Sequence, residues 1–137
     1  MWTTLQPDVV CRLPRHGSNG AGHPGIATAE PHHSANEEWE KRIANLEAFK
    51  TYKNDWDGQG AEALTNELVQ SAIHLANVLR QANIDVPSCV LPGVNGTIIF
   101  EWQDADGAYL EIEVTEPYHA DACLIVPGQP TEHWTLQ

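Results

Sequence analysis

The hydrophobic pattern of this chain changes its period at Pro87, and this change limits the fold more than any other feature. Before Pro87, apolar residues recur every three or four positions in residues 37–52, and again in a stripe that follows Thr65. This is the spacing of amphipathic helices, and threonine is a favoured N-cap residue. The first half of the chain therefore predicts two helices.

After Pro87 the apolar residues follow the patterns of β-strands. Residues 97–102 and 108–114 alternate between apolar and polar types, and a turn-forming stretch separates them. This arrangement is typical of a β-hairpin. Residues 88–91 and 122–126 are short apolar runs next to turn-forming residues, which indicates two further strands.

These elements predict one α+β domain of order ααββββ, in which two helices pack on one face of a three- to four-stranded antiparallel sheet. We expect residues 127–137 to be irregular, with Trp134 packing back. Residues 1–35 contain four Pro, four Gly and four His without hydrophobic periodicity, so we expect a flexible N-terminal tail. Ser34 opens a capping-box pattern, and the domain is therefore expected to span residues 36–137.

Charge is distributed unevenly along the chain. The net charge is −12, and nine acidic residues but no Lys or Arg follow Arg80. Such a one-signed field repels nucleic acid phosphates and anionic membranes, so we expect neither as a partner. It attracts a basic protein or a divalent cation. A basic protein is the partner that the sequence favours.

Strand alternation places the acids on the sheet face opposite the helices. The residues predicted to form an acidic binding face are Glu101, Tyr109, Glu111 and Glu113, beside Asp104 and Asp106. Such a face is typical of a protein-binding module of the inhibitor, adaptor or antitoxin and immunity kind, with the aromatic residue as a hot spot. Pairing through an exposed sheet edge, at Ser88–Leu91 or Ala122–Val126, would add a homodimer.

The segment between the two predicted helices is a compact loop with Trp56, Asp57, Gly58 and Gly60 at its centre. Glycine adopts positive φ without steric cost, Asp closes turns by accepting backbone N–H bonds, and Trp is large enough to pin the loop between helices and sheet. We interpret the loop as structural. As a calcium loop, Asp55 and Asp57 would be the first ligands, but Asn66 occupies the position that requires a bidentate Glu.

A small enzyme or a divalent-cation-binding protein that uses Asp57 with the sheet carboxylates is the alternative function. No motif indicates a particular reaction or requires a cofactor. The sequence therefore leaves catalysis undecided and favours a protein that is not an enzyme. Cys89 and Cys123 fall in apolar runs and are expected to be buried reduced thiols, and the chain contains no CxxC pair. The chain has neither the pattern of a secretory signal nor a long apolar run, so we expect a cytoplasmic protein.

The motif Trp56-Asp57-Gly58-x-Gly60-Ala61 resembles a loop shared by small uncharacterised bacterial proteins. In these proteins, as here, a helix follows the loop, and a Pro, a Gly turn, a Glu-Trp pair (Glu101-Trp102) and a Leu-Glu-Ile-Glu-like strand (Leu110–Glu113) come later. The resemblance covers residues 50–114. It implies a shared domain and transfers no function, because the family has no assigned activity. Residues 1–35 depart from the family pattern.

Overall fold

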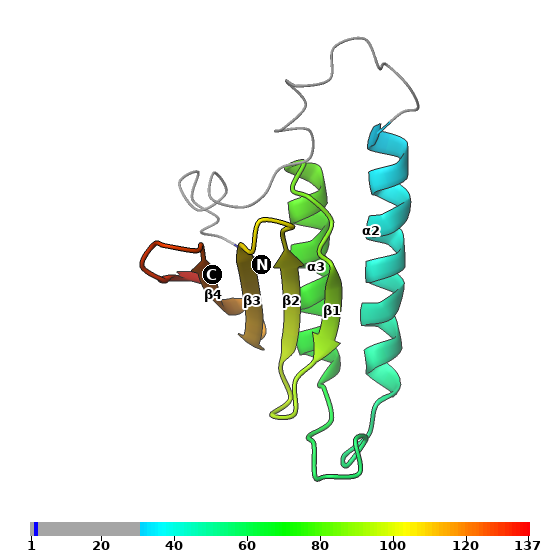
Figure 1. Cartoon of the computed structure of the whole chain (residues 1–137). Coiled ribbons are helices and arrows are strands. Elements are labelled where there is room, and N and C mark those ends of the chain that lie inside the picture. Colours follow the sequence, from blue (N-terminus) through cyan, green and yellow to red (C-terminus); the bar gives the residue numbers. More distant parts are fainter. Residues whose placement is uncertain (1, 3–30) are drawn as a thin grey trace.

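The computed structural model describes Trp2, the backbone of residues 31–34 and all atoms of residues 35–137. Two helices come first and five strands follow (Figure 1). The elements are α2 (Pro31–Ala48), the short 3-10 helix η2 (Phe49–Thr51), α3 (Asn66–Gln81), β1 (Cys89–Pro92), β2 (Ile98–Gln103), β3 (Tyr109–Glu116), β4 (His119–Ile125) and β5 (Glu132–Leu136). The predicted α+β class and the order of helices before strands are confirmed.

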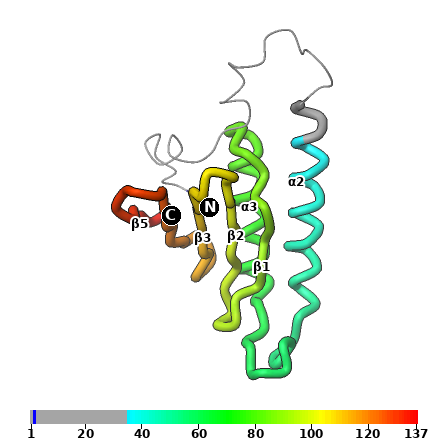
Figure 2. Tube along the Cα trace, in the orientation of Figure 1, coloured from blue at the N-terminus to red at the C-terminus, as the bar shows by residue number. Residues whose placement is uncertain are grey.

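The strands form a single antiparallel sheet in which each strand pairs with its neighbour in sequence, in the order β1-β2-β3-β4-β5. Both helices lie on one side of this sheet, with α3 behind the strands and α2 beside the β1 edge (Figures 1 and 2). We call the side that faces α3 the inner face and the opposite side the open face. Because side chains alternate along each strand, every strand contributes to both faces.

The fifth strand corrects the expectation that residues 127–137 are irregular. Trp134 and Leu136 point to the inner face, and Leu136 is fully buried. Thr135 between them points outward and is exposed, so the last residues do alternate. Only five residues carry this pattern, and the prolines and the glycine before them are typical of a loop. The strand forms because β4 offers a paired edge and the inner face takes up two apolar side chains.

The fifth strand also moves the sheet edge. The predicted edge at Ala122–Val126 is wrong, because β4 pairs with β3 on one side and with β5 on the other. The edges are β1 and β5. The prediction that the Ser88–Leu91 strand lies at an edge agrees with the strand order.

The start of α2 also differs from the prediction. The helix begins at Pro31, so Ser34 lies inside it and does not act as its N-cap. A proline fits the first helical position because its fixed φ suits a helix and its missing N–H would have no partner there. The predicted flexible tail therefore overlaps α2 at residues 31–35. The prediction also covers Trp2, which is buried in the hydrophobic core. Its remaining part, residues 1 and 3–30, falls outside the described residues.

The core lies between α3 and the inner face of the sheet. Thr65 caps α3 as predicted, since its side chain accepts a hydrogen bond from the Leu68 amide at 3.1 Å. Residues of α3 and of the inner face are fully or almost fully buried together: Val69, Ala72, Leu75, Ala76, Ile98, Phe100, Ile112, Val114 and Leu136. Burial of these side chains is the main stabilising term for the fold.

Side chains of α2 and β2 fix the segment that joins α3 to β1. Trp39 is buried, and its indole N–H donates to the Ile84 carbonyl at 3.3 Å. Arg42 donates from its guanidinium to the Pro87 and Ser88 carbonyls at 3.0 and 3.2 Å. Trp102 donates to the Asp85 carbonyl at 2.7 Å. The bonds from Trp39 and Arg42 hold α2 against the β1 edge, and the bond from Trp102 ties the same segment to β2.

Candidate functional site

The basic residues of the described domain are confined to its helical part, whereas acidic residues occur throughout. Every Lys and Arg of the described residues lies before β1, in or next to the helices. Several of these cations pair locally with acids: Lys41 contacts Glu38 and Lys50 contacts Glu47 at about 3 Å. In the part of the chain that carries the sheet, residues 88–137, eight acidic residues stand without a Lys or Arg.

The centre of the open face is a cluster of two carboxylates and one phenol. Glu101 of β2 and Glu111 of β3 are direct cross-strand partners. The Tyr109 hydroxyl lies 3.0 Å from Oε1 of Glu101 and 2.9 Å from Oε2 of Glu111. Tyr109 precedes Glu111 by two residues on β3 and is the diagonal neighbour of Glu101, so the sheet register alone brings the three groups together. We call them the Tyr109 cluster.

The Tyr109 cluster has fewer hydrogen-bond donors than acceptors. A phenol has one hydrogen and donates to one carboxylate at a time, yet two carboxylate oxygens lie within hydrogen-bonding distance of it. Partial burial, followed by the hydrogen bonds to Glu111 and Glu101, raises the pKa of Tyr109 well above its ordinary value of 10.0. The phenol therefore stays protonated as a donor, and the cluster has acceptor capacity left for a donor from outside.

Cys89 extends the cluster to β1, and its place corrects a prediction. Cys89 is the cross-strand partner of Glu101, and its thiol donates to Oε2 of Glu101 at 3.2 Å. Burial, the hydrogen bond and the charge of Glu101 raise the pKa of this thiol above 9.0. Cys89 and Cys123 are both half-buried and unpaired. They lie on the open face and not in the core, where the sequence placed them.

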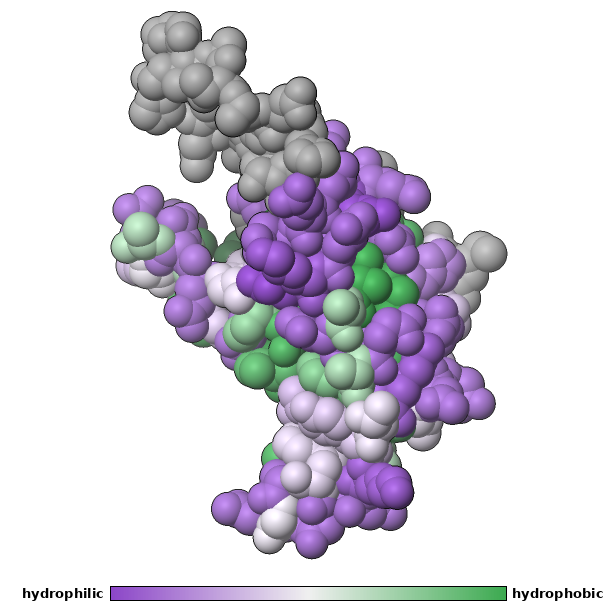
Figure 3. All heavy atoms as spheres, turned by 90° about the vertical axis from the view of Figure 1, so that its right-hand side faces the viewer, coloured by the Kyte–Doolittle hydropathy of each residue, from purple (hydrophilic) through white to green (hydrophobic). Residues whose placement is uncertain are grey.

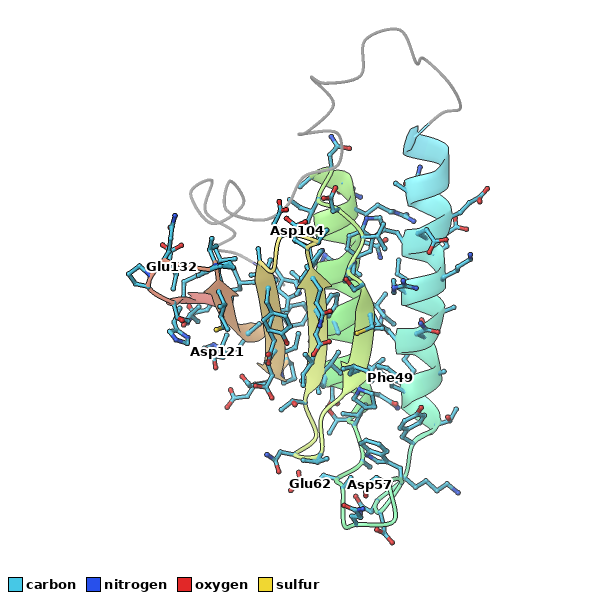
Figure 4. The ribbon with its side chains drawn as sticks, viewed as in Figure 1. Phe49, Asp57, Glu62, Asp104, Asp121 and Glu132 are labelled. Atoms are coloured by element: carbon cyan, nitrogen blue, oxygen red, sulfur yellow. The ribbon has the colours of Figure 1, made fainter. Side chains whose placement is uncertain are left out.

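The remaining predicted face residues lie around this cluster. Glu113 accepts a hydrogen bond from the Thr97 hydroxyl at 2.8 Å and is the cross-strand partner of Asp121. Asp104 and Asp106 are exposed in the turn between β2 and β3. Figure 4 shows Asp104 at the end of the sheet away from the loop that carries Asp57. The four residues predicted on the strands thus share one face, and the two predicted turn residues stand at its rim.

Apolar side chains adjoin the carboxylates on the open face. Leu91 is 39% exposed and pairs across the strands with Ile99, which in turn pairs with Glu113. Ile125 is 42% exposed and pairs with Tyr109. On the adjoining side of the molecule, which carries α2 and β1, hydrophobic residues also gather among hydrophilic ones (Figure 3). The face is therefore acidic in its centre and apolar at two of its margins.

The sequence did not identify these apolar margins or the role of Cys89. Residues 88–91 contain no clear alternation, because Cys89, Val90 and Leu91 are all apolar or weakly polar. The buried Val90 between two outward-pointing neighbours could be assigned only once the register with β2 was known. For Ile125, alternation counted forward along the chain from the inner-face residue Ala122 would have placed its side chain outward.

The loop before α3 holds its shape through side chains that accept backbone N–H bonds. Asp57 accepts from Gln59 and Ala61 at 2.8 and 3.0 Å, and these bonds lower the pKa of its carboxyl. Asp55 accepts from Gly60 at 2.7 Å. Gly58 and Gly60 have φ of 75° and 90°, the left-handed region that glycine enters without strain.

Trp56 occupies a different place from the one predicted. Its ring packs on Tyr52 with centroids 5.3 Å apart, and its N–H donates to the Glu62 carbonyl at 2.9 Å. It is half-buried and pins the loop to Tyr52, which directly follows η2, and not into the gap between helices and sheet. Asp57 lies in this loop at the end of the molecule, well away from Asp104 (Figure 4).

Within the described residues, no group of three or more His, Cys, Asp or Glu side chains has an arrangement suited to a metal ion. The carboxylate of Asp57 is already engaged by two amides of its own loop. Neither helix in the described part of the chain has the length and hydrophobicity required to cross a bilayer. Comparison with protein-family models, with curated proteins and with solved structures finds no significant match to this chain.

Proposed function

We propose that this protein is a small binding module that captures a basic protein through its open face, as inhibitors, adaptors, antitoxins and immunity proteins do. The observation that carries the proposal is the Tyr109 cluster. It holds two carboxylates side by side on a face without Lys or Arg. A guanidinium or ammonium group from a partner supplies the donors that this cluster lacks.

The apolar margins support a protein partner over a simple cation. An interface needs desolvated apolar contacts around its polar centre, and Leu91 and Ile125 stand exposed on two sides of the acidic centre. Tyr109 is an aromatic residue of the kind enriched in hot spots. We therefore infer a partner that presents Arg or Lys side chains with apolar residues next to them. In this proposal the protein works in the cytoplasm and belongs with the bacterial proteins that its loop resembles.

Self-association through the sheet is a second part of the proposal. Among the described elements, β5 is the edge strand on the side away from the helices, whereas β1 is flanked by α2 and contains Pro92, which has no N–H to donate. A homodimer would therefore form through β5. The alternative of an enzyme or cation site built on Asp57 is not favoured by any contact in the described residues.

Capture from a lysate of the native host tests the proposal, with the wild type and two charge-matched double variants as bait. Glu101→Gln/Glu111→Gln removes two charges from the open face, and Glu40→Gln/Glu67→Gln removes two from exposed helix positions. We expect one basic protein to be held by the wild type and the helix variant at low salt and lost at high salt. Equal retention by the open-face variant would contradict the proposal.

A further inference from the structure

The inner face of the sheet is covered unevenly by the helices. In the described part of the chain, α2 packs against β1, and α3 packs against β2 and β3. Neither helix packs to a similar extent against β4 or β5. Nevertheless Ala120, Ala122 and Leu136, which point inward from these two strands, are at most 2% exposed. Side chains from outside the two helices, among them Trp2, Tyr118 and Trp134, belong to this core or pack against it.

Trp2 packs against α3 and against the turn that leads into β4. Its side chain is 8% exposed, and its indole N–H donates to the Ser71 carbonyl in the middle of α3 at 2.9 Å. Its ring packs edge-on against Tyr118, with centroids 5.7 Å apart. Tyr118 follows β3 in the turn to β4, and its ring also meets His74 of α3 edge-on at 5.9 Å. Ser71, His74 and Tyr118 thus form a slot for an indole between α3 and the turn.

The shape of the slot depends on an unusual backbone conformation and on a helix carbonyl that accepts a side-chain hydrogen bond. Tyr118 has a φ of 61°, a conformation that non-glycine residues rarely adopt, and in this conformation its ring meets both Trp2 and His74. The carbonyl of Ser71 lies inside a helix and still accepts a side-chain N–H. The contacts that define the slot come from residues far along the chain from Trp2. Ser71, for example, is 69 positions away.

A second indole on the same face, which is half-buried, has an N–H without a hydrogen-bond partner among the described residues. Trp134 of β5 points inward next to Leu136, and its ring packs partly against the same core. Its N–H is nevertheless buried. An unpaired buried donor is costly and rare, so this face has room in its hydrogen bonding for one more acceptor.

We propose that the slot between α3 and the β3–β4 turn is a binding site for the indole of Trp2, which occupies it reversibly, as a ligand occupies its site. Trp2 supplies the features of an interface anchor: a large apolar area, one directed N–H and an aromatic partner. The site lies on the side of the sheet opposite the Tyr109 cluster, and no open-face carboxylate takes part. It is therefore independent of the proposed partner capture.

Full-length Trp2→Ala tests this binding site, with Trp56→Ala as a matched control that removes a half-buried indole elsewhere. The probe is a labelled peptide of residues 1–10, compared with the same peptide carrying alanine in place of Trp2. We expect Trp2→Ala to remain folded and to bind the probe at least about tenfold more tightly than the alanine peptide, as for a hot-spot residue. Wild type and Trp56→Ala should bind the probe more weakly than Trp2→Ala, because their own Trp2 fills the slot.

Amide hydrogen exchange locates the effect. Trp2→Ala should accelerate exchange in residues 119–136 and around Ser71, the probe should reverse this, and α2 should stay unchanged. A folded Trp2→Ala chain that does not bind the probe would overturn the proposal. If Trp2→Ala unfolds, Trp2→Phe takes its place in the same assay, and failure of both variants to fold would overturn the proposal by making Trp2 an indispensable core residue.

Discussion

Glu101 and Glu111 face each other directly across β2 and β3, so two carboxylates stand side by side at the centre of the open face. Like charges in this position destabilise a sheet, and the Tyr109 hydroxyl relieves the repulsion for one carboxylate at a time. The arrangement sacrifices some stability for a site that is ready to accept donors. The effects that we expect for variants of Glu111 and Tyr109 depend on this balance between stability and acceptor capacity.

Glu111→Gln should make the isolated protein more stable. The amide is nearly the same size, removes one of the two opposed charges and can donate to Glu101. We expect a gain of about 0.5–1 kcal/mol in the free energy of unfolding at low salt, and a smaller gain at high salt. Urea unfolding measures both, with Glu40→Gln as the control. A loss of more than about 1 kcal/mol would mean that the two carboxylates support the fold.

Tyr109→Phe should change how stability depends on pH. The folded state holds the phenol proton more tightly than the unfolded chain does, because the pKa of Tyr109 is raised above 10.0. The resulting stability is complete below pH 10.0 and falls as the pH rises beyond it. We expect the wild type to exceed Tyr109→Phe by about 1 kcal/mol near neutral pH, with the gap narrowing above pH 10.0. Urea unfolding at a series of pH values tests this, and a gap that widens would contradict the assigned cause.

Asp57 should be needed for the shape of its loop. Asp57→Ala removes the acceptor of the Gln59 and Ala61 amides, while Asp57→Asn keeps one acceptor oxygen. We expect faster hydrogen exchange at both amides in the alanine variant and a smaller change in the asparagine variant. In the wild type the lowered pKa means that this contribution is present above pH 3.8 and is lost as the pH falls further. Unchanged exchange in Asp57→Ala would show that the glycines alone hold the loop.

Two tryptophan variants should separate a core residue from a loop anchor. Trp39 is 1% exposed, so Trp39→Ala should cost about 3–5 kcal/mol in the free energy of unfolding. Trp56 is half-buried against Tyr52, so Trp56→Ala should cost clearly less, about 1–2 kcal/mol. Urea unfolding of the two variants gives the order. Equal losses would mean that the loop before α3 is part of the cooperative core.

Long periodic segments allowed most of the fold to be predicted from sequence. The stripe of α3 with its Thr65 cap, and the alternating strands β2 and β3, each repeat their pattern often enough to be read without tertiary information. β5 was missed because five residues after two prolines carry too little pattern. The start of α2 was misplaced because Ser34 matches a capping signal equally well inside a helix that begins at Pro31.

The sequence predicted the candidate site only as far as the alternation of side chains along a strand determines it. Alternation alone placed Glu101, Tyr109, Glu111 and Glu113 on one face, and the described structure places them there. The hydrogen bonds within the Tyr109 cluster depend on strand register and on side-chain rotamers, and the alternation of side chains predicts neither. The contact of Trp2 with Ser71 spans 69 positions and leaves no local pattern at all.

The most direct test of the open face is an NMR titration of the labelled protein with a short peptide of alternating arginine and leucine. The titration is run at about 0.1 M and about 1 M salt, where the Debye lengths are roughly 10 and 3 Å. We expect low-salt shift changes confined to open-face positions of β1 to β4, lost at high salt and in Glu101→Gln/Glu111→Gln, and kept in Glu40→Gln/Glu67→Gln. Shift changes spread over the helices, or unchanged in the open-face variant, would contradict the proposed function.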